Sequence, residues 1–541
     1  MIQPAERTLG AVCLAASARY GEKTAFSLFR EGKVCRQISY AMTALRSRQI
    51  GLLLGQLGVG PNDRVLLLSE NCPEWPLAYF GIALAGAVSV PLLTGFSPGQ
   101  VQRIAAHAEV SAIILSREMT AKIGHWALTV PLILIDTVTG EFSVSQDGCE
   151  QPLPLPSAGE SAQWLPQRKP DDLASIIYTS GTMGNSKGVM LSGANIISSS
   201  LSSLPLVKIF RRDRLLSVLP LAHAYECSLG LLAPFMSGAV IAYLDRPPSP
   251  SVLLPAAQAL RPTVMVTVPL IIEKMYRSAV APRLCRSRLY RIRLTRALAI
   301  RFAGRKLNAA LGGKIRIFGT GGAPLSAEVE EFLRRARFPV TPGYGLTEAA
   351  PLVSGTAPLR FPFKSSGSAA GGVELRIDGG GEIQVRGPNV MMGYYRDEVQ
   401  TREAFSADGW LRTGDLGSMD KKGKLYVRGR IKALILGPCG ENIYPEEIEG
   451  ILGTSQLVEE ALVYSGAKGE LVAMVRLNDA AKAAASAVEH ALEELRAWTN
   501  KQLANFSRLS RIEIRHEPFE KTPTMKIKRY LYGATAHPAQ I

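Results

Sequence analysis

Short apolar runs alternate with segments of helical periodicity along most of the chain. The runs 64–68, 175–178, 263–266 and 314–318 are rich in apolar and β-branched residues, and each has the length of a single strand. Alternation of this kind is typical of parallel sheets with helices on their faces. The sequence therefore predicts an α/β fold, with a large N-terminal domain in which β-sheets are layered with helices.

The pattern changes after Arg430, where segments 446–452 and 480–498 have helical periodicity. A chain of 541 residues is also too long to fold around one compact core. We therefore expect two units: an N-terminal domain of residues 1–430 and a small, mobile α+β C-terminal domain of residues 431–541.

One apolar stretch, residues 227–244, contains no charged residue and is almost long enough to span a bilayer. Gly230, Pro234 and Gly238 interrupt it, and the run Ala-Val-Ile-Ala-Tyr at 239–243 is typical of a strand. We predict a buried helix, a turn and a strand rather than a membrane span.

The composition agrees with a globular protein, since 47% of the residues are hydrophobic and 20% are charged. Its seven cysteines are scattered without a Cys-x-x-Cys pair, which favours reduced thiols over a disulfide framework or a zinc site. The first residues lack the basic and apolar blocks of a secretory signal. We therefore expect a cytoplasmic location.

The net charge of +16 is concentrated in one part of the chain, because no acidic residue lies between Glu273 and Glu328. Thirteen basic residues, from Lys274 to Arg316, fall in this interval, and Leu289, Ile292 and Phe302 interleave with them as in an amphipathic basic helix. A solvated basic face and peripheral contact with anionic headgroups at the inner face of a membrane both remain open. No nucleic-acid motif accompanies the charge, so we expect no nucleic-acid partner.

A loop rich in glycine and hydroxyl residues follows the predicted strand at 175–178. Its glycines let backbone N–H groups approach a polyphosphate, and its lysine adds positive charge. The spacing differs from the Walker motif, and a plain surface turn is the alternative. The candidate phosphate-binding residues are Thr179, Ser180, Gly181, Thr182, Gly184 and Lys187.

Seven further motifs follow this loop in order. They are Leu-Pro-Leu-Ala-His (219–223), Gly-Gly-Ala-Pro-Leu (321–325), Gly-Tyr-Gly-Leu-Thr-Glu (343–348), Gly-Trp-Leu-Arg-Thr-Gly-Asp (409–415), Gly-Arg-Ile-Lys (429–432), Gly-Glu-Asn-Ile-Tyr-Pro (440–445) and Lys-Thr-Pro-Thr-Met-Lys-Ile-Lys (521–528). Together the motifs resemble those of the acyl-adenylate-forming superfamily, which includes acyl-CoA synthetases, peptide-synthetase adenylation domains and firefly luciferase.

This resemblance implies an ATP site. The loop at 179–187 would hold the β- and γ-phosphates, Thr347 would bind the α-phosphate, and Glu348 would hold Mg²⁺, with Thr179 as a weaker candidate ligand. Asp415 would accept hydrogen bonds from the ribose hydroxyls and Arg430 would assist it. The residues implied for the adenine site are Gly322, Ala323, Pro324, Gly343 and Tyr344. Without the surrounding motifs, a helix or turn cap would be the favoured interpretation of Asp415, and a core aromatic that of Tyr344.

The resemblance also implies a moving catalytic group. Lys526 would reach the α-phosphate from the C-terminal domain during adenylation, Lys432 would be the hinge, and Gly440, Glu441 and Asn442 would then help form the thiol channel. His223 would lie beside the reacting carboxylate. A generic basic surface around Lys526 is the alternative, because Lys521, Lys528 and Arg529 lie close to it in the sequence.

Segments 243–248, 261–264 and 268–274 are most similar to long-chain fatty acyl-CoA synthetases. We see no acidic counter-ion beside His223 or Pro324 for an amino acid's ammonium group, whereas apolar residues at 222–232 and 263–272 suit either an alkyl tunnel or ordinary core. The predicted reaction converts a fatty acid and ATP to acyl-AMP and pyrophosphate, and then transfers the acyl group to coenzyme A. The alternatives are an acyl carrier protein as acceptor, another carboxylic acid as substrate, or a non-catalytic nucleotide-binding module.

Overall fold

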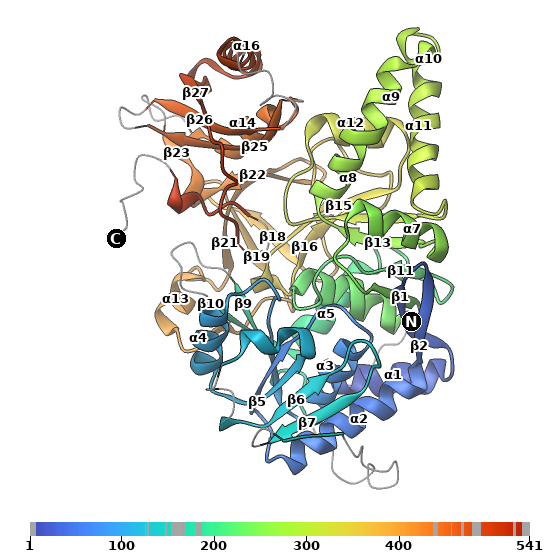
Figure 1. Cartoon of the computed structure of the whole chain (residues 1–541). Helices are drawn as coiled ribbons and strands as arrows, with labels where there is room; N and C mark the ends of the chain where they lie inside the picture. The colour runs from blue at the N-terminus through green and yellow to red at the C-terminus, as the bar shows by residue number, and fades with distance from the viewer. Residues whose placement is uncertain are drawn as a thin grey trace.

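The computed structural model describes most of the chain and shows a large lower body with two extensions at its upper end (Figure 1). The described residues are 7–124, 126, 129–146, 149–152, 166, 168–179, 187–436, 442–455, 457–466, 470–478, 488–522 and 526–532. The predicted segments 180–186, 437–441 and 480–487 therefore lie outside the description.

Two nine-stranded sheets form the body. In spatial order, the first contains β17 (Ser368–Ala369), β16 (Leu352–Gly355), β15 (Val340–Gly345), β14 (Ile317–Thr320), β13 (Val264–Thr267), β11 (Arg214–Leu216), β12 (Val240–Leu244), β1 (Thr24–Arg30) and β2 (Lys33–Ser39). The second contains β20 (Gly393–Tyr394), β10 (Lys187–Ser192), β9 (Leu173–Thr179), β4 (Val88–Pro91), β3 (Arg64–Leu68), β5 (Val110–Ser116), β6 (Leu132–Ile135), β7 (Phe142–Gln146) and β8 (Cys149–Pro152). Central strands pair in parallel and outer strands pair antiparallel.

The helices cover the faces of these sheets, so the predicted α/β class is confirmed. They are α1 (Leu9–Tyr20), α2 (Tyr40–Gln56), α3 (Glu74–Leu84), α4 (Pro98–Ala108), α5 (Gly193–Ser203), α6 (Ala233–Met236), α7 (Pro250–Leu260), α8 (Pro269–Met275), α9 (Ala281–Arg286), α10 (Arg288–Arg291), α11 (Arg296–Ala310), α12 (Ala327–Arg335) and α13 (Glu398–Glu403). Helix α3 is buried almost all round, because α1 and α2 pack against it.

The predicted strands match the observed ones to within a few residues. The run at 64–68 is β3, whereas the strand expected at 314–318 begins three residues later, at Ile317. The reason is local: the Asn308 side chain donates to the carbonyl of Ile315 and accepts from its N–H, so this residue belongs to the irregular connection before the strand.

The apolar stretch 227–244 is folded into the core, as predicted. A π-helical segment (Glu226–Leu232) leads into α6, and a turn at Gly238, with φ of +75°, connects α6 to β12. Within the described ranges, no helix has both the length and the apolar character required to cross a bilayer. The five cysteines whose side chains are described are free thiols.

A four-stranded antiparallel sheet joins the body to the last part of the chain. It consists of β18 (Glu374–Ile377), β19 (Glu382–Arg386), β21 (Leu411–Met419) and β22 (Leu425–Arg430). The part that follows contains β23 (Ile435–Leu436), β24 (Asn442–Ile443), α14 (Pro445–Leu452), β25 (Val458–Ser465), β26 (Leu471–Leu477), α16 (Val488–Asn500) and β27 (Arg511–Ile514). Its buried residues form a hydrophobic core of their own, from Ile443 to Leu509, with Ile512 and Ile514 packed against it.

Candidate active site

The predicted phosphate loop begins and ends on paired strands. Thr179 is the last residue of β9 and Lys187 is the first of β10, and the antiparallel register places them opposite each other. The intervening Ser180, Gly181, Thr182 and Gly184 lie outside the described residues. The Lys187 ammonium lies 4.7 Å from the centroid of the Tyr394 ring, an attractive cation–π distance.

Glu348 lies close to this lysine. It follows β15 in a short 3₁₀ turn that also contains Thr347, and its Oε1 accepts a 3.0 Å hydrogen bond from the Tyr394 hydroxyl. Burial, with the Glu348 carboxylate as the second cause, raises the pKa of Tyr394, so this phenol remains a donor at neutral pH. Tyr394 therefore links the lysine at the end of the phosphate loop to the predicted metal-binding carboxylate.

Asp415 is held from two sides. It lies in β21 opposite Arg430 of β22, and its Oδ1 is 3.0 Å from Arg430 Nε. The Tyr344 hydroxyl donates a 2.6 Å hydrogen bond to Oδ2. Burial, and secondly Asp415, raises the pKa of Tyr344, so its phenol stays protonated. These contacts fix both carboxylate oxygens of a residue that is almost fully buried.

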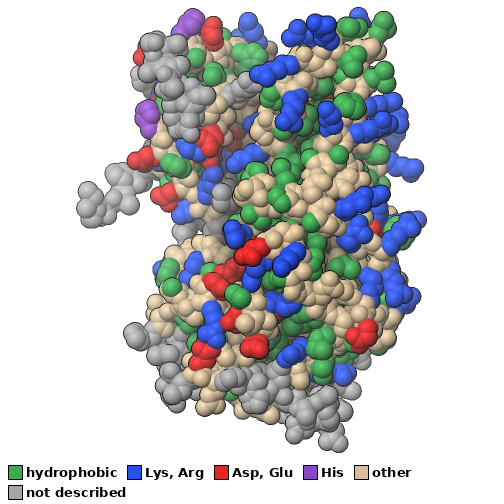
Figure 2. All heavy atoms as spheres, turned by 45° about the vertical axis from the view of Figure 1, so that its right-hand side comes forward, with side chains coloured by type: hydrophobic (Ala, Val, Ile, Leu, Met, Phe, Trp, Pro, Cys, Tyr) green, Lys and Arg blue, Asp and Glu red, His purple; other side chains and the backbone are tan. Residues whose placement is uncertain are grey.

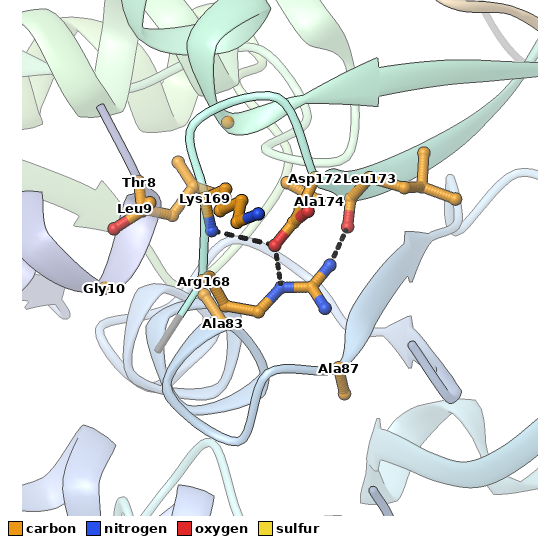
Figure 3. Close-up of a pocket in the computed structure, with 11 residues that line it drawn as sticks. Thr8, Leu9, Gly10, Ala83, Ala87, Arg168, Lys169, Asp172, Leu173 and Ala174 are labelled. Atoms are coloured by element: carbon orange, nitrogen blue, oxygen red, sulfur yellow. Dashed lines mark hydrogen bonds and ion pairs between the residues drawn. The ribbon is translucent and has the colours of Figure 1, made fainter. Parts of the chain in front are cut away.

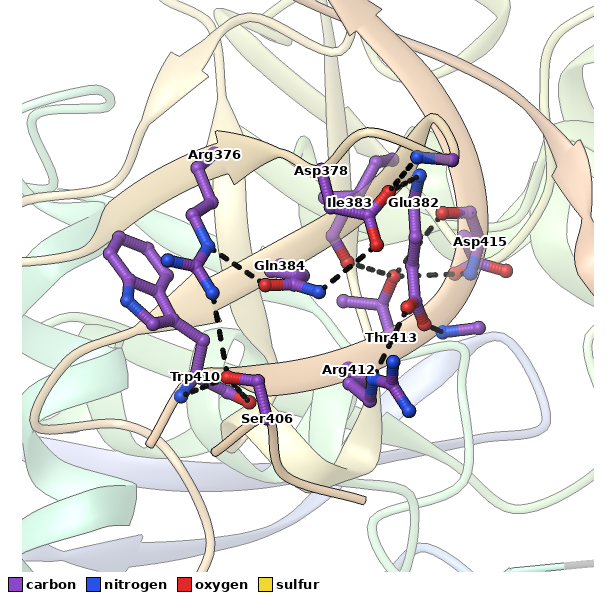
Figure 4. A network of polar contacts seen from close by, with 12 residues as sticks. Arg376, Asp378, Glu382, Ile383, Gln384, Ser406, Trp410, Arg412, Thr413 and Asp415 are labelled. Atoms are coloured by element: carbon purple, nitrogen blue, oxygen red, sulfur yellow. Dashed lines mark hydrogen bonds and ion pairs between the residues drawn. The ribbon is translucent and has the colours of Figure 1, made fainter. Parts of the chain in front are cut away.

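A polar network beneath Asp415 fixes its backbone (Figure 4). The Thr413 hydroxyl donates to the Ile383 carbonyl over 2.7 Å and accepts from the Asp415 N–H over 3.1 Å. The Gly414 N–H donates to Glu382 Oε1 over 2.9 Å. Gly414 has φ of +70°, which glycine adopts without the penalty of a Cβ. The backbone of β21 before Asp415 is therefore held in place by contacts with β19 and within β21 itself.

His223 is largely enclosed. Its Nδ1 accepts a 3.2 Å hydrogen bond from the Tyr225 N–H, so the neutral imidazole carries its proton on Nε2. Burial, and secondly the positive charge of Lys526, lowers its pKa to about 4. At neutral pH this group is an uncharged Nε2–H donor, and its acceptor nitrogen is already occupied.

Lys526 belongs to the last part of the chain, yet its charge acts on the same site. Its N–H donates to Thr522 Oγ1 over 3.2 Å, and neighbouring Lys521 and Ile527 form an isolated antiparallel bridge. Part of the Lys526 residue is exposed to solvent. The protein atoms packed around its ammonium still desolvate that group, and this burial, followed by the charge of Arg430, lowers its pKa. Its long-range interactions with His223, and with the carboxylates of Asp415, Glu446 and Glu348, place it among the predicted nucleotide residues.

The other predicted residues lie around this group. Gly343 and Tyr344 are in β15, and Gly322, Ala323 and Pro324 form a solvent-exposed loop after β14, where Gly322 has φ of +82°. Lys432 lies in an exposed 3₁₀ turn directly after β22. Asn442 begins β24 and pairs with Leu436 of β23, whereas Gly440 and Glu441 lie outside the described residues.

Three further residues that contact or electrostatically influence this group, or support the Lys526 segment, carried no clear signal in the sequence. Tyr394 lies in the segment Gly-Tyr-Tyr at 393–395, where nothing but the aromatic pair stands out. Glu446 and Arg529 lie beside predicted motifs, but only the structure pairs Arg529 with Glu449 of α14. Burial, with Arg529 acting in the opposite direction, raises the pKa of Glu446.

One expectation was wrong. Glu226 is an acidic residue only three positions after His223, although we expected no acidic counter-ion there. The structure shows why Glu226 is unsuited to be a counter-ion of an ammonium group: it is fully buried, and it accepts a 2.5 Å hydrogen bond from Ser217 Oγ. Burial raises its pKa to about 8, so it is mainly uncharged at neutral pH. A neutral, enclosed carboxyl group does not provide the charge that would hold an ammonium group.

The site also has the donors that a magnesium ion requires in a nucleotide complex. Mg²⁺ is usually held by one or two carboxylates together with phosphate oxygens and water. Glu348 supplies one carboxylate, and the described residues contain no cluster of three or more acidic, histidine or cysteine ligands that would form a dedicated protein cage. The residues therefore fit a metal that arrives with its polyphosphate.

A small pocket elsewhere in the molecule does not share this chemistry (Figure 3). It lies where the start of α1 meets residues 168–174 and contains none of the predicted site residues. Arg168 Nε lies 3.3 Å from Asp172 Oδ2, and Nη2 donates to the Leu173 carbonyl over 3.0 Å. The positive charge of Arg168 is therefore already balanced within the protein.

Comparisons with known proteins place the chain in a family. Residues 14–395 match the family model described as AMP-binding enzyme. The chain is 30% identical to long-chain-fatty-acid–CoA ligase FadD15 of Mycobacterium bovis, over 90% of this chain and 89% of that protein. It is also 30% identical to the peroxisomal long chain acyl-CoA synthetase 6 of Arabidopsis thaliana, over 91% and 79%. The crystal structure of ATP-bound MatB from Rhodopseudomonas palustris superposes with a TM-score of 0.75 at 25% identity, covering 97% of this chain and 98% of that one.

Proposed function

Because the chain belongs to the AMP-binding enzyme family, we propose that it uses ATP to activate a long-chain fatty acid and transfers the acyl group to coenzyme A. The observation that carries this proposal is the grouping of Lys187, Glu348, Asp415, His223 and Lys526, which come from distant parts of the sequence. The family relatives supply the substrate class.

The reaction has two steps. A carboxylate oxygen of the acid attacks the α-phosphorus, the bond from that phosphorus to the bridging oxygen breaks, and pyrophosphate leaves. The sulfur of coenzyme A then attacks the acyl carbon, the bond to the phosphate oxygen breaks, AMP leaves, and the thiol proton passes to solvent. The first step brings an anion to a polyanion, which repel by about 1 kcal/mol per pair of charges in water and by more in a drier site. Cations and hydrogen-bond donors that are already in place lower this barrier.

In this proposal, the residues of the chain divide the phosphate charge. Thr179, Lys187 and the loop between them bind the β- and γ-phosphates, and Thr347 donates to the α-phosphate. Lys526 approaches the oxygen that leaves with pyrophosphate, as suits a point charge on a flexible stem. His223 orients the acid through its Nε2–H. Bound Mg²⁺, held by Glu348, would neutralise phosphate charge.

In the same proposal, a second set of residues binds the nucleoside part of ATP. Asp415 accepts hydrogen bonds from the ribose hydroxyls, and Arg430 supports it. The exposed loop Gly322-Ala323-Pro324 and the Gly343-Tyr344 strand enclose the adenine between a flat backbone and an aromatic face. The buried position of Asp415 supports this role, because a fixed carboxylate loses little conformational freedom when it binds two hydroxyls.

We further propose that residues 1–430 and 431–541 are two domains that change their relative orientation between the steps, with Lys432 as the hinge. The separate hydrophobic core after Ile443 supports this division. The electrostatic interactions of Lys526 with Asp415 and Glu348 support an orientation suited to adenylation. The second orientation would withdraw Lys526 and bring in Gly440, Glu441 and Asn442 to form the thiol channel.

The acceptor and the location are the finer points of the proposal. Coenzyme A is favoured by the relatives, and acyl carrier protein is the alternative acceptor. Peripheral contact with an anionic membrane through residues 274–316 belongs to the same proposal, since long-chain acids partition into bilayers.

A chain-length screen tests the function. Purified protein is given ATP, Mg²⁺ and fatty acids from short to very long, and AMP release is followed with either coenzyme A or acyl carrier protein present. We expect AMP release with long-chain acids and coenzyme A, because each buried methylene contributes about 0.8 kcal/mol to acid binding. Activity confined to amino acids or aromatic acids would reject the substrate class, and activity with carrier protein alone would reject coenzyme A.

A further inference from the structure

The basic segment after α8 is not one amphipathic helix. A π-helical stretch (Tyr276–Val280) continues α8 into α9, and α9, α10 and α11 form a protrusion. Figure 1 shows α9, α10 and α11 extending from the first sheet at the end of the molecule where the C-terminal part lies. The three helices have one buried side, formed by Leu284, Ala299, Ile300 and Leu307. The opposite side faces solvent.

A row of large apolar side chains lies on the solvent side. Leu298 and Phe302, four residues apart, share one face of α11, and Leu294 lies in the turn just before that helix; the three are 63%, 57% and 92% exposed, respectively. Leu289 and Ile292 extend the row toward α10. Scattered exposed apolar residues are ordinary, whereas five on one protrusion indicate a binding surface.

Basic side chains border this row. Figure 2 shows lysine and arginine side chains gathered over the protrusion, with apolar side chains between them. Arg293, Arg301 and Arg305 are exposed, and Lys306 lies 4.7 Å from the centroid of the Phe302 ring. The interval between Glu273 and Glu328 is described throughout and contains no acidic residue, and none of the described ion pairs involves a basic residue from Arg283 to Lys314. The charge of the protrusion is therefore uncompensated.

We propose that this protrusion docks the protein onto an anionic lipid bilayer, with the Leu294–Leu298–Phe302 face in the interface and the flanking arginines on lipid phosphates. Apolar side chains alone would suit many partners, and basic side chains alone would suit any polyanion. Both together on one short helical surface match an interface that has acyl chains below anionic headgroups. A nucleic acid would neutralise the arginines but leave three large apolar groups in water.

The position of the protrusion connects it to the proposed substrate. Helix α8 begins directly after Val268, whose side chain approaches Gly322 in the predicted adenine loop, and the basic segment continues from the end of α8. Docking would therefore hold the acid-activating site close to the bilayer from which a long-chain acid is drawn. The inference deepens the proposed function and rests on it for this purpose, but the docking itself does not depend on catalysis.

Vesicle co-sedimentation of the full chain, without substrates, tests the docking. The probes are vesicles of phosphatidylcholine alone and of phosphatidylcholine with 30% phosphatidylglycerol, at low and at high salt. We expect strong binding to the anionic vesicles only, and weakening of that binding by salt. Arg293→Gln, Arg301→Gln and Arg305→Gln should each weaken it roughly fivefold. The triple variant Leu294→Ser, Leu298→Ser, Phe302→Ser should weaken it by about tenfold or more.

Matched controls lie elsewhere on the surface. The exposed residues Val138, Leu359 and Val399 changed to serine, and Lys421 and Lys422 changed to glutamine, should leave vesicle binding unchanged. All variants should keep wild-type AMP release with a detergent-dispersed acid, because none of the changed residues belongs to the proposed active site.

Equal vesicle binding by the wild type and the apolar triple variant would overturn the proposal, as would binding to neutral vesicles alone. Self-association without vesicles that the triple variant abolishes would instead assign the face to a second copy of the chain. Vesicle binding without AMP release would reject the proposed function and leave the docking intact.

Discussion

Asp415 and Lys526, which lie at opposite ends of the proposed active site, are held in different ways. Asp415 lies inside the four-stranded sheet, where Tyr344 and Arg430 bind both of its oxygens. Lys526 has its hydrogen-bonded contacts on the last part of the chain, at Thr522, and Arg529 nearby pairs with Glu449 of α14. In the proposed reaction, the body would preorganise the binding of the nucleoside, whereas a unit with its own hydrophobic core would deliver the positive charge to the leaving oxygen.

Removing the positive charge of Lys526 should have the largest effect on activity. In Lys526→Ala we expect acid-dependent pyrophosphate exchange to fall about 10²–10³-fold, because a cation aimed at the reacting phosphate is lost. Transfer from preformed acyl-AMP to coenzyme A should stay near the wild-type rate. Lys528→Ala is the matched control, since Lys528 pairs with Glu520 and should leave exchange unchanged. Unchanged exchange in the Lys526 variant would contradict the assignment.

Changing Asp415, which the four-stranded sheet holds in place, should weaken ATP binding instead. Asp415→Asn keeps the shape of the side chain but removes its charge, and we expect a loss of about 2 kcal/mol, some 30-fold in kcat/KM for ATP. Both half-reactions that bind the nucleotide should weaken, unlike in the Lys526 variant. ATP is titrated in the adenylation half-reaction and preformed acyl-AMP in the transfer to coenzyme A, and a defect confined to adenylation would break the comparison.

The attachment of the lysine segment gives a smaller and more selective effect. Arg529 Nη1 donates to Glu449 Oε1 over 2.8 Å, so this pair holds the segment that carries Lys526 against α14. Arg529→Gln should lower the kcat of adenylation about tenfold, or about 1.4 kcal/mol, with little change in KM and with thioester formation retained. Arg529→Lys should restore part of the rate. An equal loss in both half-reactions would indicate a general structural role instead.

The smallest predicted effect concerns pH. Burial and the charge of Lys526 hold the pKa of His223 near 4, below its ordinary value of 6.5, so the imidazole is already neutral throughout the neutral range. As pH falls, its protonation is delayed until about pH 4. Adenylation should therefore change less than about twofold between pH 6 and 8 on account of this group. A pH–rate profile with a clear inflection near 6.5 that disappears in His223→Gln would show that the histidine titrates as an exposed one.

The sequence predicted local features well, because their causes are local. β3 follows from five consecutive residues of strand type, and α14 follows from the proline at its first position and the periodicity after it. The start of β14 was misplaced, because the Asn308 side chain binds both backbone groups of Ile315, two residues before the strand begins. The basic segment was expected as one helix and is three, because Ser287 and Ile292 adopt extended backbone conformations between the helices.

By itself, the sequence determined the type of chemistry: which cations, carboxylates and glycine-rich turns are present, in which order, and the α/β alternation that carries them. Only the tertiary structure decided which of these groups meet. The Lys187–Tyr394–Glu348 and Tyr344–Asp415–Arg430 contacts join residues between 15 and more than 200 positions apart, and they depend on sheet registers that no local pattern encodes. Charge and apolarity at 289–306 were visible in the chain, but whether they face water or the core depends on how the helices pack.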